Sequence, residues 1–200
     1  MTRAFCFLDL ETTGLNLQTA QILEVACILT DFHGLNEFGN VHSYVHYEDV
    51  TFDPFIVNMH TENGLWDAMN NWMLNGEKGN ARPLPQISYV DTLLADWIGN
   101  LKAVYNLDHI EMAGSTIGQF DMQLCNRDFP HFMKHLHHRV FDVRSLKTLA
   151  EMTHNDVPEI IVEPKHRAMS DCQSELKYAR QFLRPMWETS SYAEHVEKIL

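Results

Sequence analysis

An apolar segment near the start of the chain leads directly into two acidic residues that are one residue apart. Residues 5–15 read Phe-Cys-Phe-Leu-Asp-Leu-Glu-Thr-Thr-Gly-Leu. The aromatic-rich first half predicts a buried strand, and open α/β sheets bind their ligands at the carboxyl ends of such strands. Alternate residues of a strand point to the same face, so Asp9 and Glu11 should project together.

Two carboxylates held this close repel each other and shift each other's pKa values. A divalent cation relieves that repulsion, and hard oxygen ligands suit Mg²⁺ or Mn²⁺. The alternative interpretation is a strand that ends in a solvated Asp9 and Glu11, followed by a turn at Thr-Thr-Gly. This pair alone does not decide between the two.

The charge of the chain limits its partners. Its formal net charge is -12, and it would stay strongly acidic without four metal-binding carboxylates. Proteins that grip long nucleic acids usually present a basic face. Tight, sequence-independent binding to a long duplex is therefore not expected, whereas a short nucleic acid held mainly by metal ions fits, as does no nucleic acid at all.

Length and cysteine usage predict a single domain over residues 1–200 in a reducing compartment. Two hundred residues suffice for one substantial core. No apolar run is long enough to span a bilayer, so no membrane contact is expected. The four cysteines are scattered without a CxxC pair, which predicts reduced thiols and a cytoplasmic location; they are Cys6, Cys27, Cys125 and Cys172.

The apolar patterns along the chain predict an α/β fold. Further strands are expected over 21–31, 40–46, 109–114 and 140–143, and helices over 65–74, 87–104, 118–127, about 145–152 and 168–187. Pro54 breaks the regular pattern, and the segment 60–64 looks like a loop with a capping Thr61 before a helix. The longest loop is expected over 75–85, and one more helical segment is expected in the tail up to residue 200. An antiparallel meander followed by alternating helices and strands indicates a mixed sheet flanked by helices.

Two more acidic residues are expected at helix starts. Asp121 follows the strand over 109–114, and Asp171 enters the last helix five residues after His166. Any one of these acids alone is more often a helix cap or a solvated strand end than a ligand. Four carboxylates and a histidine in this order favour a metal site.

In this order the motifs resemble the DEDDh 3′→5′ exonucleases of the ribonuclease H-like fold, and within that superfamily oligoribonuclease most closely. The resemblance covers about residues 5–182. It is carried by Leu-Asp-Leu-Glu-Thr-Thr-Gly-Leu at 8–15, His-Thr-x-x-Gly-Leu at 60–65, Ser-Thr-Ile-Gly-Gln at 115–119, His-Arg-Val-Phe-Asp-Val at 138–143 and His-Arg-Ala-Met-x-Asp at 166–171. It implies a mixed five-stranded sheet and phosphodiester hydrolysis.

The resemblance also implies a catalytic centre with two divalent metal ions, Mg²⁺ or Mn²⁺, clamped by carboxylates. Asp9 would bridge both ions, Asp171 would share the ion that carries the attacking water, and Glu11 and Asp121 would complete the sites. His166 is then the expected general base, since an unperturbed histidine pKa of ~6.5 suits proton transfer near neutral pH. The product would be a nucleoside 5′-monophosphate.

Substrate contacts carried over from the family complete the hypothesis. Leu15 and Phe55 would pack on the two bases of a dinucleotide, and stacking is worth ~1–3 kcal/mol per base. The other predicted substrate contacts are His60, Thr116, His138 and Arg139, of which the last three align with a cap for the 5′ phosphate. Part of that cap comes from a second subunit in the family, which implies a homodimer.

The chain departs from oligoribonucleases in this region. Thr116 and His138 replace the family's Ser and Tyr, and Phe120 is an extra residue before Asp121. Short single-stranded RNA is the expected substrate. A general 3′→5′ exonuclease that trims longer single-stranded RNA or DNA is the first alternative, and a catalytically silent binding module is the second.

Overall fold

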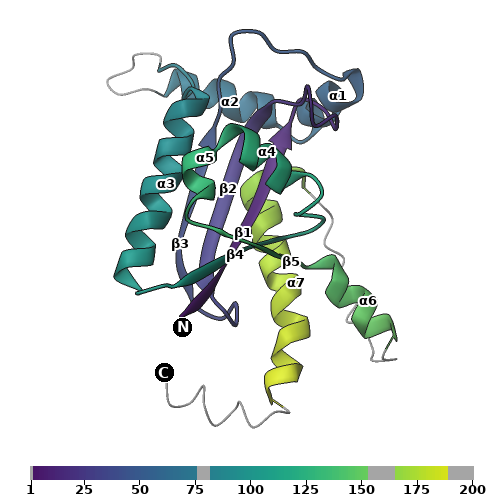
Figure 1. Ribbon diagram of the computed structural model, residues 1–200. Helices are drawn as coiled ribbons and strands as arrows, with labels where there is room; N and C mark the ends of the chain where they lie inside the picture. Colours follow the sequence, from purple (N-terminus) through teal and green to yellow (C-terminus); the bar gives the residue numbers. More distant parts are fainter. Residues whose placement is uncertain (1, 76–81, 153–164, 189–200) are drawn as a thin grey trace.

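The computed structural model describes residues 2–75, 82–152 and 165–188 (Figure 1). One mixed five-stranded sheet runs in the order β3-β2-β1-β4-β5. Its strands are β1 (Arg3–Thr12), β2 (Ile22–Asp31), β3 (Glu37–Tyr44), β4 (His109–Gly114) and β5 (His137–Asp142). The first three strands pair antiparallel, and β4 and β5 continue the sheet parallel to β1. The predicted fold class is confirmed.

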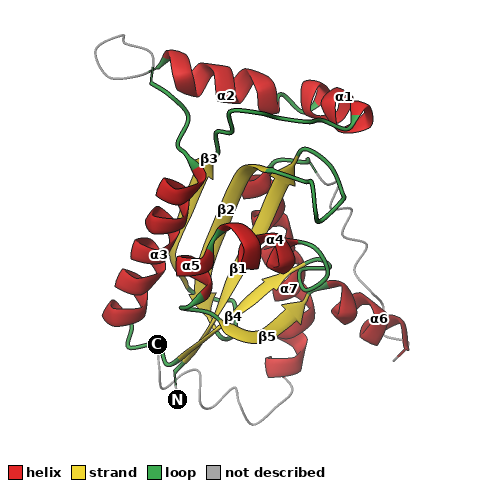
Figure 2. Cartoon of the chain, turned by 45° about the horizontal axis from the view of Figure 1, so that its top comes forward, coloured by secondary structure: helices red, strands yellow, loops and turns green. Residues whose placement is uncertain are grey.

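Helices cover both faces of this sheet. The helices α3 (Ile87–Val104), α4 (Asp121–Asp128) and α5 (Pro130–Met133) lie on one face, and α7 (Ala168–Glu188) lies on the other, with α6 (Arg144–Met152) beside it. Two further helices, α1 (Pro54–Glu62) and α2 (Leu65–Leu74), lie across one end of the sheet (Figure 2).

The central strand β1 is buried on both faces, which explains its nearly continuous apolar run. Cys6 and Leu8 pack with the core under α3 and α4, whereas Phe5 and Phe7 pack with the core under α7. By the same alternation, Asp9 and Glu11 follow Phe5 and Phe7 onto the α7 face. The acidic pair is thereby directed towards the helix that begins near Asp171.

The helix α1 was not predicted, and the expected loop around His60 is wrong. Pro54 was taken as a break, but it occupies the first turn of α1, where its missing N–H costs nothing. The side chain of Asp53 caps this helix by accepting a hydrogen bond from the Phe55 backbone N–H at 2.8 Å. His60 therefore lies inside a helix, and only Asn63 and Gly64 separate α1 from α2.

Other boundaries shifted by a few residues. The third strand begins at Glu37 rather than at residue 40, β5 begins at His137 rather than at 140, and α4 begins only at Asp121. A helix expected over the C-terminal tail, and most of the loop expected over 75–85, fall outside the described residues. All four cysteines are free and buried. Within the described part of the chain, no helix has the length and apolarity needed to cross a membrane.

Candidate active site

The predicted carboxylates come from three elements that meet at one end of the sheet. β1 carries Asp9 and Glu11, Asp121 is the first residue of α4, and Asp171 lies in the first turn of α7. Two backbone N–H groups hold the Asp171 carboxylate: that of Lys165 at 2.9 Å from Oδ1 and that of Arg167 at 3.3 Å from Oδ2. The backbone just before α7 thus fixes the position of this side chain.

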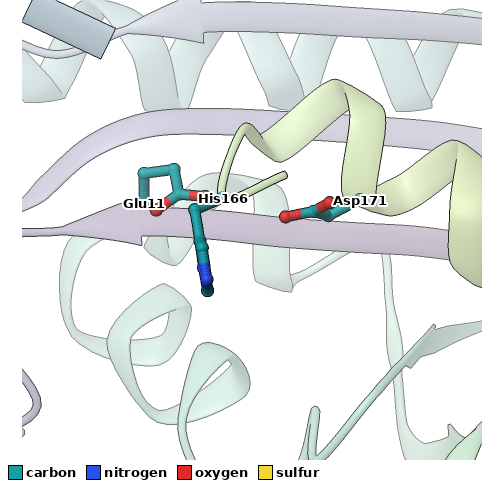
Figure 3. A group of neighbouring side chains, drawn as sticks. All are labelled: Glu11, His166 and Asp171. Carbon is teal, nitrogen blue, oxygen red and sulfur yellow. The ribbon is translucent and has the colours of Figure 1, made fainter. Parts of the chain in front are cut away.

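His166 joins Glu11 and Asp171 in a compact group (Figure 3). One potential ligand atom from each of the three residues lies within 4.8 Å of the other two. His166 is exposed and has a positive φ of 50°, an uncommon conformation for a residue other than glycine. Its main-chain oxygen accepts a hydrogen bond of 2.5 Å from the side-chain amide of Asn63. This contact helps hold the unusual conformation in place.

Several acidic side chains of the site are buried close together. Burial, followed by the charges of Asp121 and Glu11, raises the pKa of Asp9 well above its usual range. Burial, followed by the charges of Glu24 and Asp171, raises the pKa of Glu11 to about 8. Burial is also the main reason that the pKa of Asp121 is raised to about 7. Divalent cations would favour the ionised forms, so these residues fit a metal centre.

A buried ion pair supports the loop that carries His166. Glu24, only 1% exposed, accepts hydrogen bonds from the Arg167 guanidinium at 3.0 and 3.2 Å and from the Ala168 N–H at 3.1 Å. Burial opposes its charge, but these bonds and one with His42 at 2.7 Å together lower the pKa of Glu24 to about 2. The sequence analysis did not identify Glu24, although a single acidic residue inside an apolar strand indicates a buried carboxylate that needs a partner.

Glu175 is a fifth carboxylate near the site, and it was also missed. It lies one helical turn after Asp171 on α7 and accepts a hydrogen bond from the Ser115 N–H at 2.8 Å. Burial raises its pKa to about 7, and the charge of Asp171 adds to this effect. Its Oε2 atom is buried without a hydrogen-bond partner among the described residues. Only the spacing of Asp171 and Glu175 could have indicated it from sequence.

Leu15 and Phe55, the predicted base contacts, are 77% and 74% exposed. They come from neighbouring segments, because the Asp53 N–H donates a hydrogen bond of 3.1 Å to the Thr13 main-chain oxygen. Two large apolar side chains are thus presented to solvent from adjoining segments, Leu15 just beyond the strand that carries Asp9 and Glu11 and Phe55 at the start of α1.

His60 is buried, in contrast to the exposed Leu15 and Phe55. Its side chain is fully buried, and its Nε2–H donates a hydrogen bond of 2.9 Å to the Thr12 main-chain oxygen. Nδ1 is then free to accept the hydrogen bond of 3.3 Å from the Asn63 amide. The same Nδ1 lies 3.8 Å from Glu11 Oε2. In this structure His60 links α1 to the end of β1.

The three residues assigned to the phosphate cap do not meet within one chain. Thr116 follows β4 at the end of the sheet near Asp121, in a turn with a φ of 54°. His138 and Arg139 are exposed near the start of the edge strand β5, which is parallel to β4. Asp142, four residues after His138, is the residue that pairs with Gly114 at the far end of β4. These two segments would therefore need a second chain to surround one phosphate.

Comparisons with known proteins find similarity to exonucleases. The family model RNase T, described as exonuclease, matches residues 6–69. An oligoribonuclease of Nocardia farcinica is 29% identical over 188 residues, which cover 88% of this chain and 78% of the relative. The human mitochondrial oligoribonuclease is 25% identical over 184 residues, with 88% and 70% coverage.

Solved structures match in fold. An exonuclease I from Methylocaldum szegediense has a TM-score of 0.61 at 14% identity, with 93% of this chain and 41% of that one covered. An Escherichia coli exonuclease I in complex with single-stranded DNA has a TM-score of 0.60 at 15% identity, with 94% and 42% covered. The chain thus spans about two fifths of the length of these exonuclease I chains, and at such identities the likeness concerns the fold alone.

Proposed function

We propose that this chain, which resembles the DEDDh exonucleases, is a 3′→5′ exoribonuclease that hydrolyses short oligoribonucleotides to nucleoside 5′-monophosphates. The single observation that carries this proposal is the meeting of four carboxylates and His166 at one end of the sheet. The oligoribonuclease relatives support the substrate class. Residues 1–200 would act as one exonuclease domain.

Asp9, Glu11, Asp121 and Asp171 would hold two divalent ions, Mg²⁺ or Mn²⁺. When bound, such ions lower the pKa of a water molecule and neutralise charge on the phosphate. The chain supplies the positions of these ligands: β1 fixes Asp9 and Glu11 on one face, and backbone N–H groups orient Asp171. The raised pKa values of Asp9, Glu11 and Asp121 support cation binding in place of full protonation.

His166 is the proposed general base. A ring nitrogen takes a proton from the attacking water, whose oxygen forms a bond to the phosphorus as the bond from phosphorus to the 3′ oxygen of the preceding nucleotide breaks. The leaving 3′ oxygen takes a proton from solvent, and the terminal nucleotide departs as a 5′-monophosphate. The exposure of His166 lets it pass its proton to bulk water after each cycle.

Substrate binding would depend on stacking more than on charge. Leu15 and Phe55 would pack on bases, a contact that tolerates any sequence. Thr116 and, from a second copy of the chain, His138 and Arg139 would hold the 5′ phosphate. This proposal requires a homodimer, and a mass measurement in solution that finds only monomer would contradict it.

A general single-strand 3′→5′ exonuclease is the second candidate. The separation of Thr116 from His138 and Arg139 favours it, because these three residues of one chain do not gather into a cap that would stop a longer strand. A catalytically silent binding module is disfavoured, because none of the five expected residues is missing.

The experiment that tests the activity uses a five-nucleotide RNA labelled at its 5′ end, with Mn²⁺ or with EDTA. We expect stepwise shortening from the 3′ end, release of 5′-monophosphates and no reaction in EDTA. The variants Asp171→Ala and His166→Ala should be inactive or strongly impaired, with exposed Asp96→Asn as the control. Internal cleavage, or cleavage that persists in EDTA, would contradict the proposal.

A further inference from the structure

The carboxylate of Glu175 connects α7 with the turn that precedes α4. Its Oε1 accepts the Ser115 N–H at 2.8 Å, and Ser115 directly follows β4. The turn continues through Thr116, whose main-chain oxygen accepts from the Gln119 N–H at 2.9 Å, and leads to Asp121. Glu175 therefore joins the helix that carries Asp171 to the segment that carries Asp121.

The second oxygen of Glu175 is in an unfavourable position without a cation. Oε2 is buried and has no hydrogen-bond partner among the described residues. Arg144 is near enough to favour the charged form of Glu175 but makes no hydrogen bond to Oε2. The carboxylates of Asp9, Asp121 and Asp171 are all near enough to interact with its charge. A buried oxygen without a hydrogen-bond partner destabilises the fold, and the effect is larger when the group is charged.

The backbone next to Glu175 leaves room for this carboxylate. A Cβ added to Gly114 would lie 3.2 Å from Glu175 Oε2 and 2.9 Å from the Leu8 main-chain oxygen. A residue with a side chain at position 114 would thus press on both β1 and the carboxylate. Leu8 immediately precedes Asp9, so Oε2 lies close to the strand segment from which Asp9 projects.

From these contacts we infer that Glu175 is a fifth carboxylate ligand of the cation centre, with Oε1 holding the Ser115 turn and Oε2 facing the ion held by Asp9 and Asp121. The inference rests on the proposed metal-dependent function and assigns it one more residue. With a cation bound, the Glu175 side chain would contact both the ion and the Ser115 turn, and would thereby connect the ion to the segment that leads to Asp121.

A glutamine at position 175 separates this role from a purely structural one. Glu175→Gln keeps an amide oxygen for the Ser115 N–H but replaces the second carboxylate oxygen with an NH₂ group, which cannot bind a cation. If Glu175 only holds the turn, this variant should bind Mn²⁺ as the wild type does. If Glu175 is a ligand, Mn²⁺ binding should weaken while the metal-free fold is kept.

The experiment is a calorimetric titration with Mn²⁺ alone, combined with thermal melts with and without Mn²⁺. For Glu175→Gln we expect a loss of about tenfold or more in affinity at one ion site and a smaller Mn²⁺-induced rise in Tm. The metal-free Tm should be unchanged or higher, because a like charge has been removed. Asp96→Asn, which removes one exposed charge on α3, should behave as wild type.

Wild-type Mn²⁺ affinity in Glu175→Gln would overturn the inference. The Asp9→Ala variant shows which claim has failed: if it loses Mn²⁺ binding while Glu175→Gln does not, only the role of Glu175 falls. If Asp9→Ala also binds Mn²⁺ normally, the proposed function falls as well. A structure of the wild-type protein with Mn²⁺ gives a check that needs no variant, since Oε2 in contact with an ion supports the inference and Oε2 away from every ion refutes it.

Discussion

The side-chain amide of Asn63 donates a hydrogen bond of 2.5 Å to the main-chain oxygen of His166, which lies 103 residues further along the chain. The same side chain also contacts the first residue of the next helix, because its Oδ1 accepts the Leu65 N–H at 2.9 Å. Asn63 also contacts His60, which lies against Glu11. The junction between α1 and α2 is thus connected to both the proposed general base and a proposed metal ligand.

The variant Asn63→Asp should slow the reaction without unfolding the protein. Aspartate keeps the oxygen that accepts the Leu65 N–H but cannot donate to His166, so the His166 loop loses one restraint. We expect kcat to fall by about tenfold to a hundredfold, since small misplacements of catalytic groups have effects of this size. Asn58→Asp, on the exposed face of α1, is the matched control. Equal kcat for the two variants would show that Asn63 does not position His166.

The pair of Glu24 and Arg167 should govern stability in acid. The pKa of Glu24 is lowered from 4.5 to about 2, so its ionised form stabilises the fold above pH 4.5. That contribution should disappear as the pH falls from 4.5 towards 2. Glu24→Gln should cost about 2 kcal/mol at neutral pH, the size of hydrogen bonds to a charged group, and should flatten the acid slope.

Urea unfolding of wild type and Glu24→Gln at a series of pH values measures both effects. Glu37→Gln serves as the control, because Glu37 pairs with Arg180 in an exposed ion pair that should contribute little. An unchanged acid slope in Glu24→Gln would mean that Glu24 is not the group that titrates.

Leu15 and Phe55 should contribute to substrate binding and not to stability. Both side chains are largely exposed, so Leu15→Ala and Phe55→Ala should change the free energy of unfolding by no more than about 0.5 kcal/mol. Loss of a stacking partner should weaken binding of a short RNA by ~1–3 kcal/mol per base. Leu74→Ala, on exposed α2, is the control. Unaltered KM in both variants would remove these residues from the substrate site.

The sequence was sufficient for the fold class, and it also singled out the acidic residues that we propose as metal ligands, because both depend on local patterns. The apolar run before Asp9 and the position of Asp171 in the first turn of a helix each follow from a few neighbouring residues. The helix α1 was missed because Pro54 is a break in some contexts and a first-turn residue in others. Here Pro54 begins a helix because the side chain of Asp53 caps that helix.

Contacts between distant elements could not be predicted in this way. Glu24 meets Arg167 across 143 residues, and Glu175 meets Ser115 across 60. Neither pair has a local sequence signature, because the sheet order and the path of α7 bring them together. The surroundings of His60 could not be predicted either. A sequence motif suggested a substrate contact, whereas the structure buries the side chain between Thr12, Glu11 and Asn63.

The central claim is that the substrate is short, and a length series tests it most directly. Single-stranded RNAs of two, three, five and ten or more nucleotides, labelled at the 5′ end, are incubated with Mn²⁺ beside matched DNAs, with Asp171→Ala as the inactive control. We predict that the RNA dinucleotide is cleaved fastest and that the rate falls sharply with length. Rates that stay level or rise with length would contradict the account and identify a general single-strand exonuclease.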